Sequence, residues 1–403
     1  MFTLFIIVFL DLIGFGMIIP VFPFYAERTG VDPASVIFFL GLYSLGQLVG
    51  SPVWGALSDR IGRRPVLLIT LFGNTVASIM LAFADSGFTL ALSRVAAGLA
   101  AGNVATAYAY ATDITTDETR PKALGLLGSA FGLGFIAGPA LGGLLAGNDA
   151  AGDGLVRVAW GAAVMSLIAF VLTLARLPES LSAEARATTR SRPRVKLGEY
   201  FRRDGLRQVL LTTIVVIAAV AMLQSTLALW AAETMNMGPR TLGLVYVFVG
   251  VVSVVVQVWL TAPLTKRFGA YVLAQIGIVF VAVGMIAVPV SPGIATLLVA
   301  LGVFGFGSAI LNPTFGNLVA GLAGPTERGA ALGAYQSAAS FGRVVGPFTA
   351  SGVATVSNLS WPFVVGAVVS LGGIALVRGA GRQAALVAGR AKDDSAGAPT
   401  DTA

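Results

Sequence analysis

Apolar residues gather into long runs along the chain, and polar and charged residues gather between those runs. A run of roughly 17–25 apolar residues is long enough for one helical membrane crossing. Strands are a poor alternative, because the runs are too long and their apolar and polar positions do not alternate. The pattern predicts an all-α membrane protein with twelve transmembrane helices. Their expected bounds are 2–25, 34–57, 66–84, 87–110, 121–146, 155–176, 207–232, 241–264, 271–290, 293–319, 329–353 and 361–378.

The charges between the runs predict the orientation of the helices. If both termini are cytoplasmic, most of the 26 Lys and Arg residues fall in cytoplasmic segments, as membrane proteins prefer. This basic balance indicates contact with the inner leaflet rather than with nucleic acid. The first run has neither a basic start nor a small-residue cleavage site. We therefore expect a retained spanning helix rather than a signal peptide.

The longest polar segment, 177–206, contains SAEARATTRSRPRVK and separates six runs from six. It is typical of a cytoplasmic linker with room for a short surface helix. The expected domains are an N-terminal six-helix bundle (1–176), this linker, and a C-terminal six-helix bundle (207–379). The tail, 380–403, is rich in Ala, Gly and Asp, and we expect it to be disordered.

An internal repeat relates the two halves. Shifted by 208 positions, TRPKALGLLGSAFGLGFIAGP (119–139) aligns with ERGAALGAYQSAASFGRVVGP (327–347). Shifted by 207, LSDRIG (57–62) aligns with LTKRFG (264–269). Shared hydrophobicity alone would not align Arg, Ser and Gly-Pro positions in this way. We therefore expect two pseudo-symmetric bundles, in which the fifth run corresponds to the eleventh and the second to the eighth.

The composition excludes several functions. Of 403 residues, 56% are hydrophobic and 11% are charged, against about 25% charged in soluble domains. The mean hydropathy is +0.86. The chain has no Cys and no His, which excludes disulfides, thiolate metal sites and histidine catalysis. Nucleotide-binding loops and catalytic strings are also missing from the sequence. We expect neither an enzyme nor a bound metal or cofactor.

The segment GALSDRIGRRPVLL (55–68) joins the second and third runs. In this tight turn, Asp59 can accept hydrogen bonds from free amides at a helix N-terminus, and Arg63 can hold a carboxylate from another helix. A turn that merely keeps positive charge inside explains the charges equally well. The complete string, however, closely resembles the G-x-L-S-D-R-x-G-R-R signature of the major facilitator superfamily.

Three further segments strengthen this resemblance. LDLIGFGMIIPVFPFYAE (10–27) is similar to the first helix of tetracycline-type drug/proton antiporters. SRVAAGLAAG (93–102) is similar to the R-x-x-x-G element that this family links to proton coupling, and GFIAGPALGG (134–143) to the Gly-Pro element of antiporters. The resemblance implies a major facilitator fold, a place in the drug/proton antiporter branch, and an antiporter element in the fifth helix made of Gly134, Gly138, Pro139 and Gly142.

The same resemblance implies a cytoplasmic gate. Asp113 would be the partner of Arg63, and the cluster would break when the protein opens inward. The implied gate residues are Gly55, Asp59, Arg60, Gly62, Arg63, Arg64 and Asp113.

Asp11 lies about 14 Å along the first helix, near the middle of a membrane core about 30 Å thick. A carboxylate there costs roughly 2.5–3.5 kcal/mol unless it is paired or protonated. Two interpretations stay open. Asp11 couples transport to protons, with Arg94 pairing to it in one state and releasing it in another, or the two residues form a static pair throughout the cycle.

Gln336, Ser340 and Arg343 share one face of the eleventh helix, because they recur at i, i+4 and i+7. Such a face points into a cavity and not into lipid. Arg343 either meets substrate there or ties this helix to the first or seventh. A cationic wall favours anionic, zwitterionic or metal-chelating molecules. Other polar residues within spans more often bond neighbouring helices than ligands; the cavity candidates among them are Gln47, Asn103, Gln224, Gln257 and Asn312.

One departure concerns the substrate. Tetracycline exporters carry a histidine in the eighth helix, and this chain contains none, which weakens tetracycline itself as the substrate. We carry two functions forward. The first is proton-coupled export of small amphipathic drugs or metabolites by alternating access. The second is transport of a metabolite, lipid or siderophore, anionic or zwitterionic, on the same fold. Either would act in a bacterial cytoplasmic membrane, as a monomer, with protons, substrate and lipid as partners.

Overall fold

The computed structural model describes residues 1–24, 29–116, 118–148, 153–181, 197–323 and 327–396. Within these ranges every regular element is a helix. Ten helices there are long and apolar enough to cross a membrane. Together with the shorter apolar helix α1 (Phe2–Ile18) and the more polar α16 (Arg328–Val356), these helices are consistent with the predicted twelve spans. The chain is a multi-pass, all-α membrane protein.

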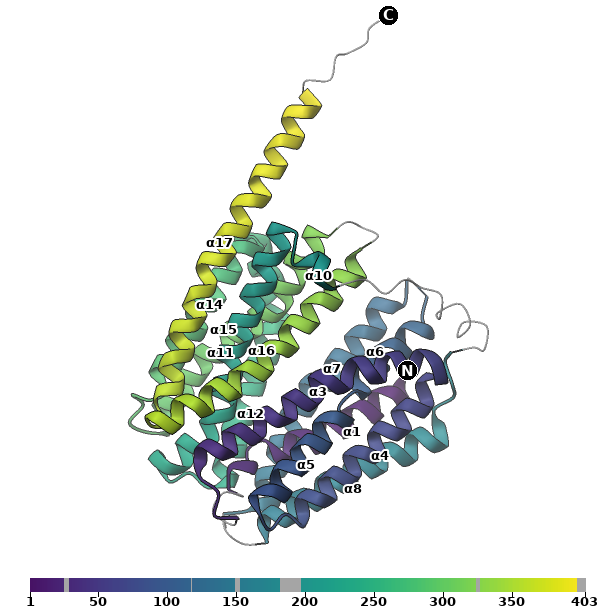
Figure 1. The fold of residues 1–403 in the computed structure, drawn as a ribbon, viewed down its shortest axis with the longest axis vertical. Coiled ribbons are helices and arrows are strands. Elements are labelled where there is room, and N and C mark those ends of the chain that lie inside the picture. Colours follow the sequence, from purple (N-terminus) through teal and green to yellow (C-terminus); the bar gives the residue numbers. More distant parts are fainter. Residues whose placement is uncertain (25–28, 117, 149–152, 182–196, 324–326, 397–403) are drawn as a thin grey trace, which may run out of the picture.

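The spans form two groups, drawn in purple to blue and in teal to yellow in Figure 1. The N-terminal bundle contains α1 with η1 (Phe22–Phe24), α3 (Pro33–Ile61), α4 (Arg63–Ala82), α5 (Gly87–Ala100) with α6 (Asn103–Asp113), α7 (Arg120–Ala146) and α8 (Gly154–Arg176). The C-terminal bundle contains α11 (Asp204–Met235), α12 (Pro239–Val255) with η2 (Val256–Leu260) and α13 (Thr261–Phe268), α14 (Ala270–Ala287), α15 (Ile294–Leu322), α16 and α17 (Trp361–Ala396).

Helix α3 begins at a side-chain cap and ends at a glycine. The Asp32 carboxylate accepts a hydrogen bond from the Ser35 amide at 3.0 Å and caps the first turn. The hydrogen bonds from Ser35 hold the pKa of Asp32 below its usual range. At the other end, Gly62 has φ +113°, which side chains rarely tolerate, and the chain turns there directly into α4.

The internal repeat is visible in the backbone. Gly269, which corresponds to Gly62 in the repeat, has φ +76° and likewise ends one helix, α13, and begins the next, α14. In a second match, Gly138 lets α7 approach the backbone of α1, and Gly346 lets α16 approach the backbone of α11. Equivalent helices are therefore packed in equivalent ways in the two bundles.

The bundles meet at one end and part at the other. We call the end with the Gly62 and Gly269 turns the basic end, because Arg63, Arg64, Lys266 and Arg267 lie there. At the opposite end the bundles touch: the Ser351 hydroxyl donates to the carbonyl of Ala34 at 2.8 Å. The rings of Phe38 and Phe348 meet there with centroids 4.9 Å apart.

Toward the basic end this contact is lost. A Cβ atom on Gly143 would lie 3.0 Å from the Pro239 carbonyl oxygen, and one on Gly132 would lie 3.2 Å from Val254. Gly128, four residues nearer the basic end, has no described atom within 4 Å of its Cβ position. The same holds for Gly329 and Gly333 on α16. The protein is therefore open toward the basic end.

The predicted linker, 177–206, is described only at its two ends, and residues 182–196 lie outside the described residues. The short helix α10 (Leu197–Tyr200) lies against α16. Arg203 donates to both carboxylate oxygens of Glu327 at 2.5 and 3.1 Å. These bonds hold the pKa of the Glu327 carboxyl below its usual range and fasten the start of the C-terminal bundle.

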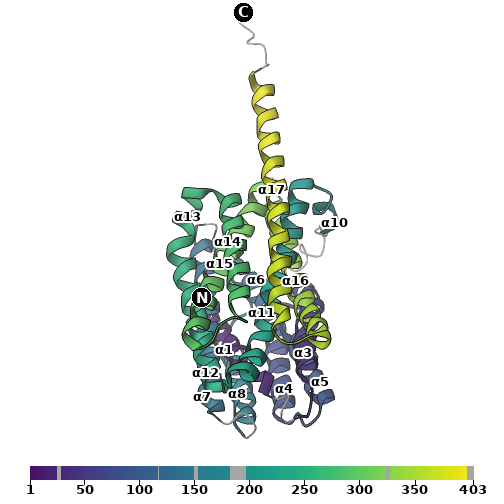
Figure 2. The same ribbon diagram turned by 90° about the vertical axis from the view of Figure 1, so that its left-hand side faces the viewer.

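The end of the chain differs from the prediction. Helix α17 continues through Ala396 and runs beyond the other helices in Figures 1 and 2. The sequence predicted disorder from residue 380, and this is wrong up to Ala396; residues 397–403 lie outside the described residues. The reason is that Ala, Arg, Gln and Lys in this segment are strong helix formers, so a helix that has already begun continues.

Candidate functional site

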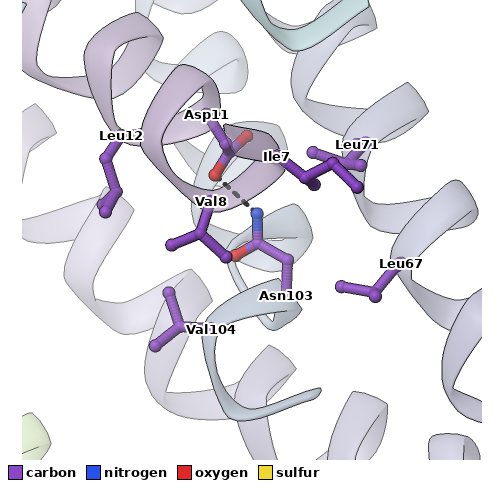
Figure 3. A pocket seen from close by; sticks show the side chains of 8 residues that line it. All are labelled: Ile7, Val8, Asp11, Leu12, Leu67, Leu71, Asn103 and Val104. Atoms are coloured by element: carbon purple, nitrogen blue, oxygen red, sulfur yellow. Dashed lines mark hydrogen bonds between the residues drawn. The ribbon is translucent and has the colours of Figure 1, made fainter. Parts of the chain in front are cut away.

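Asp11 lies inside the N-terminal bundle, on α1, and is only 8% exposed. Asn103, the first residue of α6, donates through Nδ2 to Oδ2 of Asp11 at 2.5 Å, as Figure 3 shows. Asn74 of α4 donates to the other carboxylate oxygen at 3.0 Å. The acid is thus held by two neutral amides from two different helices.

A small cavity of about 10 Å³ adjoins this carboxylate. Apart from Asp11 and Asn103 its walls are apolar side chains, among them Val8, Leu71 and Val104 (Figure 3). The space suits about one water molecule. A proton donor or acceptor of that size therefore has room beside Asp11.

Arg94 and Asp11 do not form an ion pair in this structure. Arg94 is 3% exposed, and its guanidinium lies over the ring of Phe22 at 5.0 Å from the centroid. Among the described residues no ion pair joins Arg94 to Asp11, whose two oxygens are taken by Asn74 and Asn103. In this conformation the two residues therefore do not form the pair that the second of the two interpretations requires throughout the cycle. Hydropathy and spacing do not reveal that two amides lie nearer to the acid.

The fourth span is broken beside this site. Helix α5 ends at Ala100 and α6 begins at Asn103, so the backbone between them leaves the helical pattern. The indole of Trp54 donates to the Leu99 carbonyl at 2.6 Å, which supplies a partner at the break. Asn103 was predicted to line a substrate cavity. It is 6% exposed, donates to Asp11 and lines the small cavity beside that carboxylate.

Arg63 is the centre of a charged cluster at the basic end. Its Nη1 donates to Asp59 at 2.5 Å and to the Ser58 hydroxyl at 2.7 Å, and its Nε donates to Asp113 at 3.0 Å. The predicted pair of Arg63 with Asp113 is present. Arg60, by contrast, is exposed, and Gly55 has no described atom within 4 Å of its Cβ position.

Two expectations for this cluster are corrected. Asp59 was expected to accept from amides at a helix N-terminus, but Glu179 does so, from Arg63 N at 2.9 Å and Arg64 N at 3.2 Å. The cluster was also expected to break on opening, yet it is intact in a protein open at this end. The reason is that α3, α4, α6 and Glu179 all belong to the N-terminal side, so parting the bundles leaves the cluster whole.

In the C-terminal bundle, Gln336, Ser340 and Arg343 follow one face of α16, as predicted. The Arg343 Nη2 donates to the Ser340 hydroxyl at 3.2 Å. The neighbouring Tyr335 donates its hydroxyl proton to the carbonyl of Asn312 at 3.0 Å and to the Asn312 side chain.

Among the described residues, no hydrogen bond or ion pair joins the remaining predicted cavity residues to the face of α16 that carries Arg343. Gln224 is exposed on α11, and Gln257 is exposed within the π-helical turn η2, beside the exposed Trp259. Gln47 is half-buried on α3. Tyr43, also on α3, does come near, since its phenol interacts electrostatically with Asp11, Arg94 and Arg343.

The glycines of the predicted antiporter element have a packing role. A Cβ atom on Gly134 would lie 2.6 Å from that of Leu12, and one on Gly138 would lie 2.7 Å from the Gly16 Cα. A Cβ atom on Gly142 would collide with the Met17 carbonyl oxygen. Pro139 lies inside α7, and the helix continues past it. This row fixes α7 against α1, the helix that carries Asp11.

Sequence reasoning missed two residues that hold these clusters together. Asn74 was visible only as one of many polar residues within spans. Glu179 was visible as an acid directly after Pro178, at the start of a basic linker. Neither signal reveals a partner more than 60 positions away in the chain.

Two repeated helical bundles, parted at one end, with a buried acid in the first helix, are the architecture of secondary transporters. The model of the Major Facilitator Superfamily matches residues 4–262 and 209–393. The chain belongs to this superfamily and is a membrane transporter.

Similar proteins include resistance proteins from two bacteria. The tetracycline resistance protein, class C, of Escherichia coli is 29% identical over 381 residues, covering 90% of this chain and 92% of that protein. Multidrug resistance protein 2 of Bacillus subtilis is 25% identical over 383 residues, covering 93% and 94%.

Among solved structures, the human organic anion transporter MFSD10 superposes with a TM-score of 0.68 at 21% identity, covering 93% of this chain and 98% of that one. The nucleoside transporter NupG superposes with a TM-score of 0.73 at 15% identity, covering 93% and 98%. At these identities the likeness concerns the fold alone.

Proposed function

We propose that this transporter exports small amphipathic molecules from a bacterial cytoplasm and is driven by inward movement of protons through Asp11. The similarity to tetracycline and multidrug resistance proteins supports the class of substrate. The arrangement around Asp11 supports the coupling to protons.

The observation that carries the proposal is that Asp11 is buried with amide partners and without an ion pair among the described residues. An ionised carboxylate without a counter-charge is costly inside a protein. Protonation removes that cost. Amide groups both donate and accept hydrogen bonds, so Asn74 and Asn103 suit either protonation state. A fixed cation would have held the acid ionised.

The basic end is assigned to the cytoplasm by the excess of Lys and Arg there. In this orientation the arrangement described above corresponds, under this proposal, to the inward-open state, and export requires a second state that is open at the other end. The contacts between the rings of Phe38 and Phe348 would part, and the glycine-lined faces of α7 and α16 would close. The Arg63 cluster would keep α3, α4 and α6 together as one body during this exchange.

The test compares Asp11→Asn with the wild type in a pump-deficient bacterial host challenged with a panel of antibiotics and dyes. Compounds that the wild type resists are then followed in everted membrane vesicles, with substrate-induced proton release as the readout. We expect Asp11→Asn to lose resistance and proton release together, because the amide cannot exchange a proton. Exchange of labelled for unlabelled substrate without a gradient should persist.

The matched control is Asp85→Asn, which makes the same chemical change in an exposed connection. It should behave like the wild type. Undiminished proton release in Asp11→Asn would contradict the coupling role. A wild type that protects against no compound in the panel would contradict drug export and leave metabolite or lipid transport on the same fold.

A further inference from the structure

Arg343 lies on the open face of α16. Gly329 and Gly333 have no described atom within 4 Å of their Cβ positions, and Gln336 is exposed. Ser340 and Arg343 continue this row at helical spacing. A molecule that enters from the basic end therefore meets this row, and Arg343 is its last polar member.

The row ends where the bundles close. Five residues beyond Arg343, the Phe348 ring packs on Phe38 and lies within 3.3 Å of the Cβ position of Gly41. Phe38 and Gly41 belong to the other bundle. Arg343 thus lies at the closed end of the space between the bundles, where a bound molecule would come to rest.

The guanidinium there has unused donors. Arg343 donates to Ser340 at 3.2 Å, and its electrostatic neighbours are the phenols of Tyr43 and Tyr335. Within the described part of the chain, no carboxylate forms an ion pair with it. A guanidinium offers five N–H donors, and a half-buried cation without a counter-ion is costly. An incoming anion would lower that cost.

An aromatic row in the N-terminal bundle begins at Tyr43, whose phenol interacts electrostatically with Arg343. Phe135 of α7, which corresponds to Arg343 in the internal repeat, is 41% exposed. Its ring lies edge-on to Phe15 at 6.1 Å, and Phe15 stacks on Tyr43 at 4.9 Å. Substrate sites in such transporters form between the repeats. Here one repeat contributes a cation and the other contributes aromatic surface.

From this arrangement we propose that Arg343 binds an anionic group of the transported molecule, a carboxylate or phosphate, while Phe135, Phe15 and Tyr43 hold its apolar part. The site rests on the proposed transport function and narrows its substrates to amphipathic organic anions and zwitterions. Arginine suits the task because its planar fork bonds carboxylate and phosphate through two parallel hydrogen bonds.

The experiment uses two probes that differ in one group. Dansyl-glycine carries a carboxylate, and dansyl-glycinamide carries a neutral amide in its place. Each is titrated by fluorescence into the full-length protein in phosphatidylcholine nanodiscs. We expect the wild type to bind the carboxylate at least about tenfold more tightly, which is the effect of one charge-assisted hydrogen bond. Arg343→Gln should abolish this preference, and Arg343→Lys should keep part of it.

Two controls separate this site from proton coupling. Asp11→Asn should keep the preference for the carboxylate, even if it no longer transports. Arg240→Gln, at an exposed arginine at the opposite end, should change nothing. Unchanged affinity of Arg343→Gln for the neutral probe shows that the variant is folded.

The proposal is overturned if Arg343→Gln retains the preference, or if the wild type shows none. Phosphatidylglycerol nanodiscs distinguish the source of the anion. Displacement of dansyl-glycine from the wild type by this lipid, with no effect on the neutral probe, would identify a lipid headgroup as the occupant of the Arg343 site. Unchanged binding would identify a soluble organic anion.

Discussion

At the scale of single residues, Gly62 and Glu179 show how one turn is made. Gly62 adopts a backbone conformation that is nearly closed to other residues, and the Glu179 carboxylate lies against it while accepting from the first two amides of α4. Gly269 has the same kind of backbone, but no described atom lies within 4 Å of its Cβ position. A side chain at Gly269 would therefore suffer backbone strain alone, whereas one at Gly62 would also collide with Glu179.

We expect Gly269→Ala to lower the free energy of unfolding by about 1–3 kcal/mol through backbone strain. Gly62→Ala should cost about 1 kcal/mol more, because the new methyl group displaces Glu179 and uncaps α4. Thermal unfolding of both purified variants in detergent measures the difference. Equal losses in the two variants would show that the Glu179 contact contributes nothing.

The residues themselves were more predictable than their partners. The depth of Asp11 follows from counting along a helix, and the pairing of Arg63 with Asp113 was implied by the family resemblance. The amides on Asp11 were not predictable, because they depend on how α4 and α6 are rotated about their axes. Hydropathy carries no information on rotation when a helix is apolar on all sides.

At the scale of elements, the seam between α7 and α1 is a contact of backbone against backbone. Gly142 leaves no room for a side chain beside Met17, whereas Gly128, on the same helix, borders open space. The repeat places an equivalent seam between α16 and α11. Each bundle is therefore held by close packing of small residues, which is how helices associate in lipid.

We expect Gly142→Ala to destabilise the protein by about 1–3 kcal/mol, because the methyl group forces α7 away from α1. Gly128→Ala should be neutral or stabilising by up to about 1 kcal/mol, since alanine favours the helix and meets no neighbour. Chemical denaturation of the two variants gives the comparison. A destabilised Gly128→Ala would mean that its surroundings are more crowded than described.

The elements were well predicted where hydropathy defines them. The second span was expected over 34–57 and extends over Pro33–Ile61, because charged residues of its last turns remain helical. The break at Ala101 and Gly102 and the π-helical turn at Val256–Leu260 were not predicted. Both are changes in backbone hydrogen bonding inside apolar runs, and apolarity is unaffected by them.

At the scale of the whole molecule, the glycine-lined row on α16 marks the surface that would close in the second state of the proposed cycle. Gly333 faces that space near the basic end. Gly352, on the same helix near the opposite end, also has open space. Nine residues at about 100° each place it on the opposite side of α16 from Arg343. A large side chain at position 333 should interfere with closure of the basic end, and one at position 352 should not.

We expect Gly333→Phe to leave thermal stability within about 0.5 kcal/mol of the wild type, as for other substitutions that meet no neighbour. Transport in vesicles should nevertheless be lost, because the ring would hold the basic end open. Gly352→Phe should transport normally. Normal transport by Gly333→Phe would place the closing surface elsewhere.

The position of the Arg63 cluster within one bundle bears on the energetics of the cycle. Opening the basic end separates no oppositely charged groups of this cluster, so electrostatic attraction there is not what the moving halves must overcome. The resistance to leaving the state shown here arises instead at the far end, where the ring contact of Phe38 with Phe348 and the hydrogen bond from Ser351 to Ala34 must part. Contacts of this kind depend little on dissolved ions. Turnover should accordingly be insensitive to the ionic strength of the solution at the basic end, even though Lys and Arg are concentrated there.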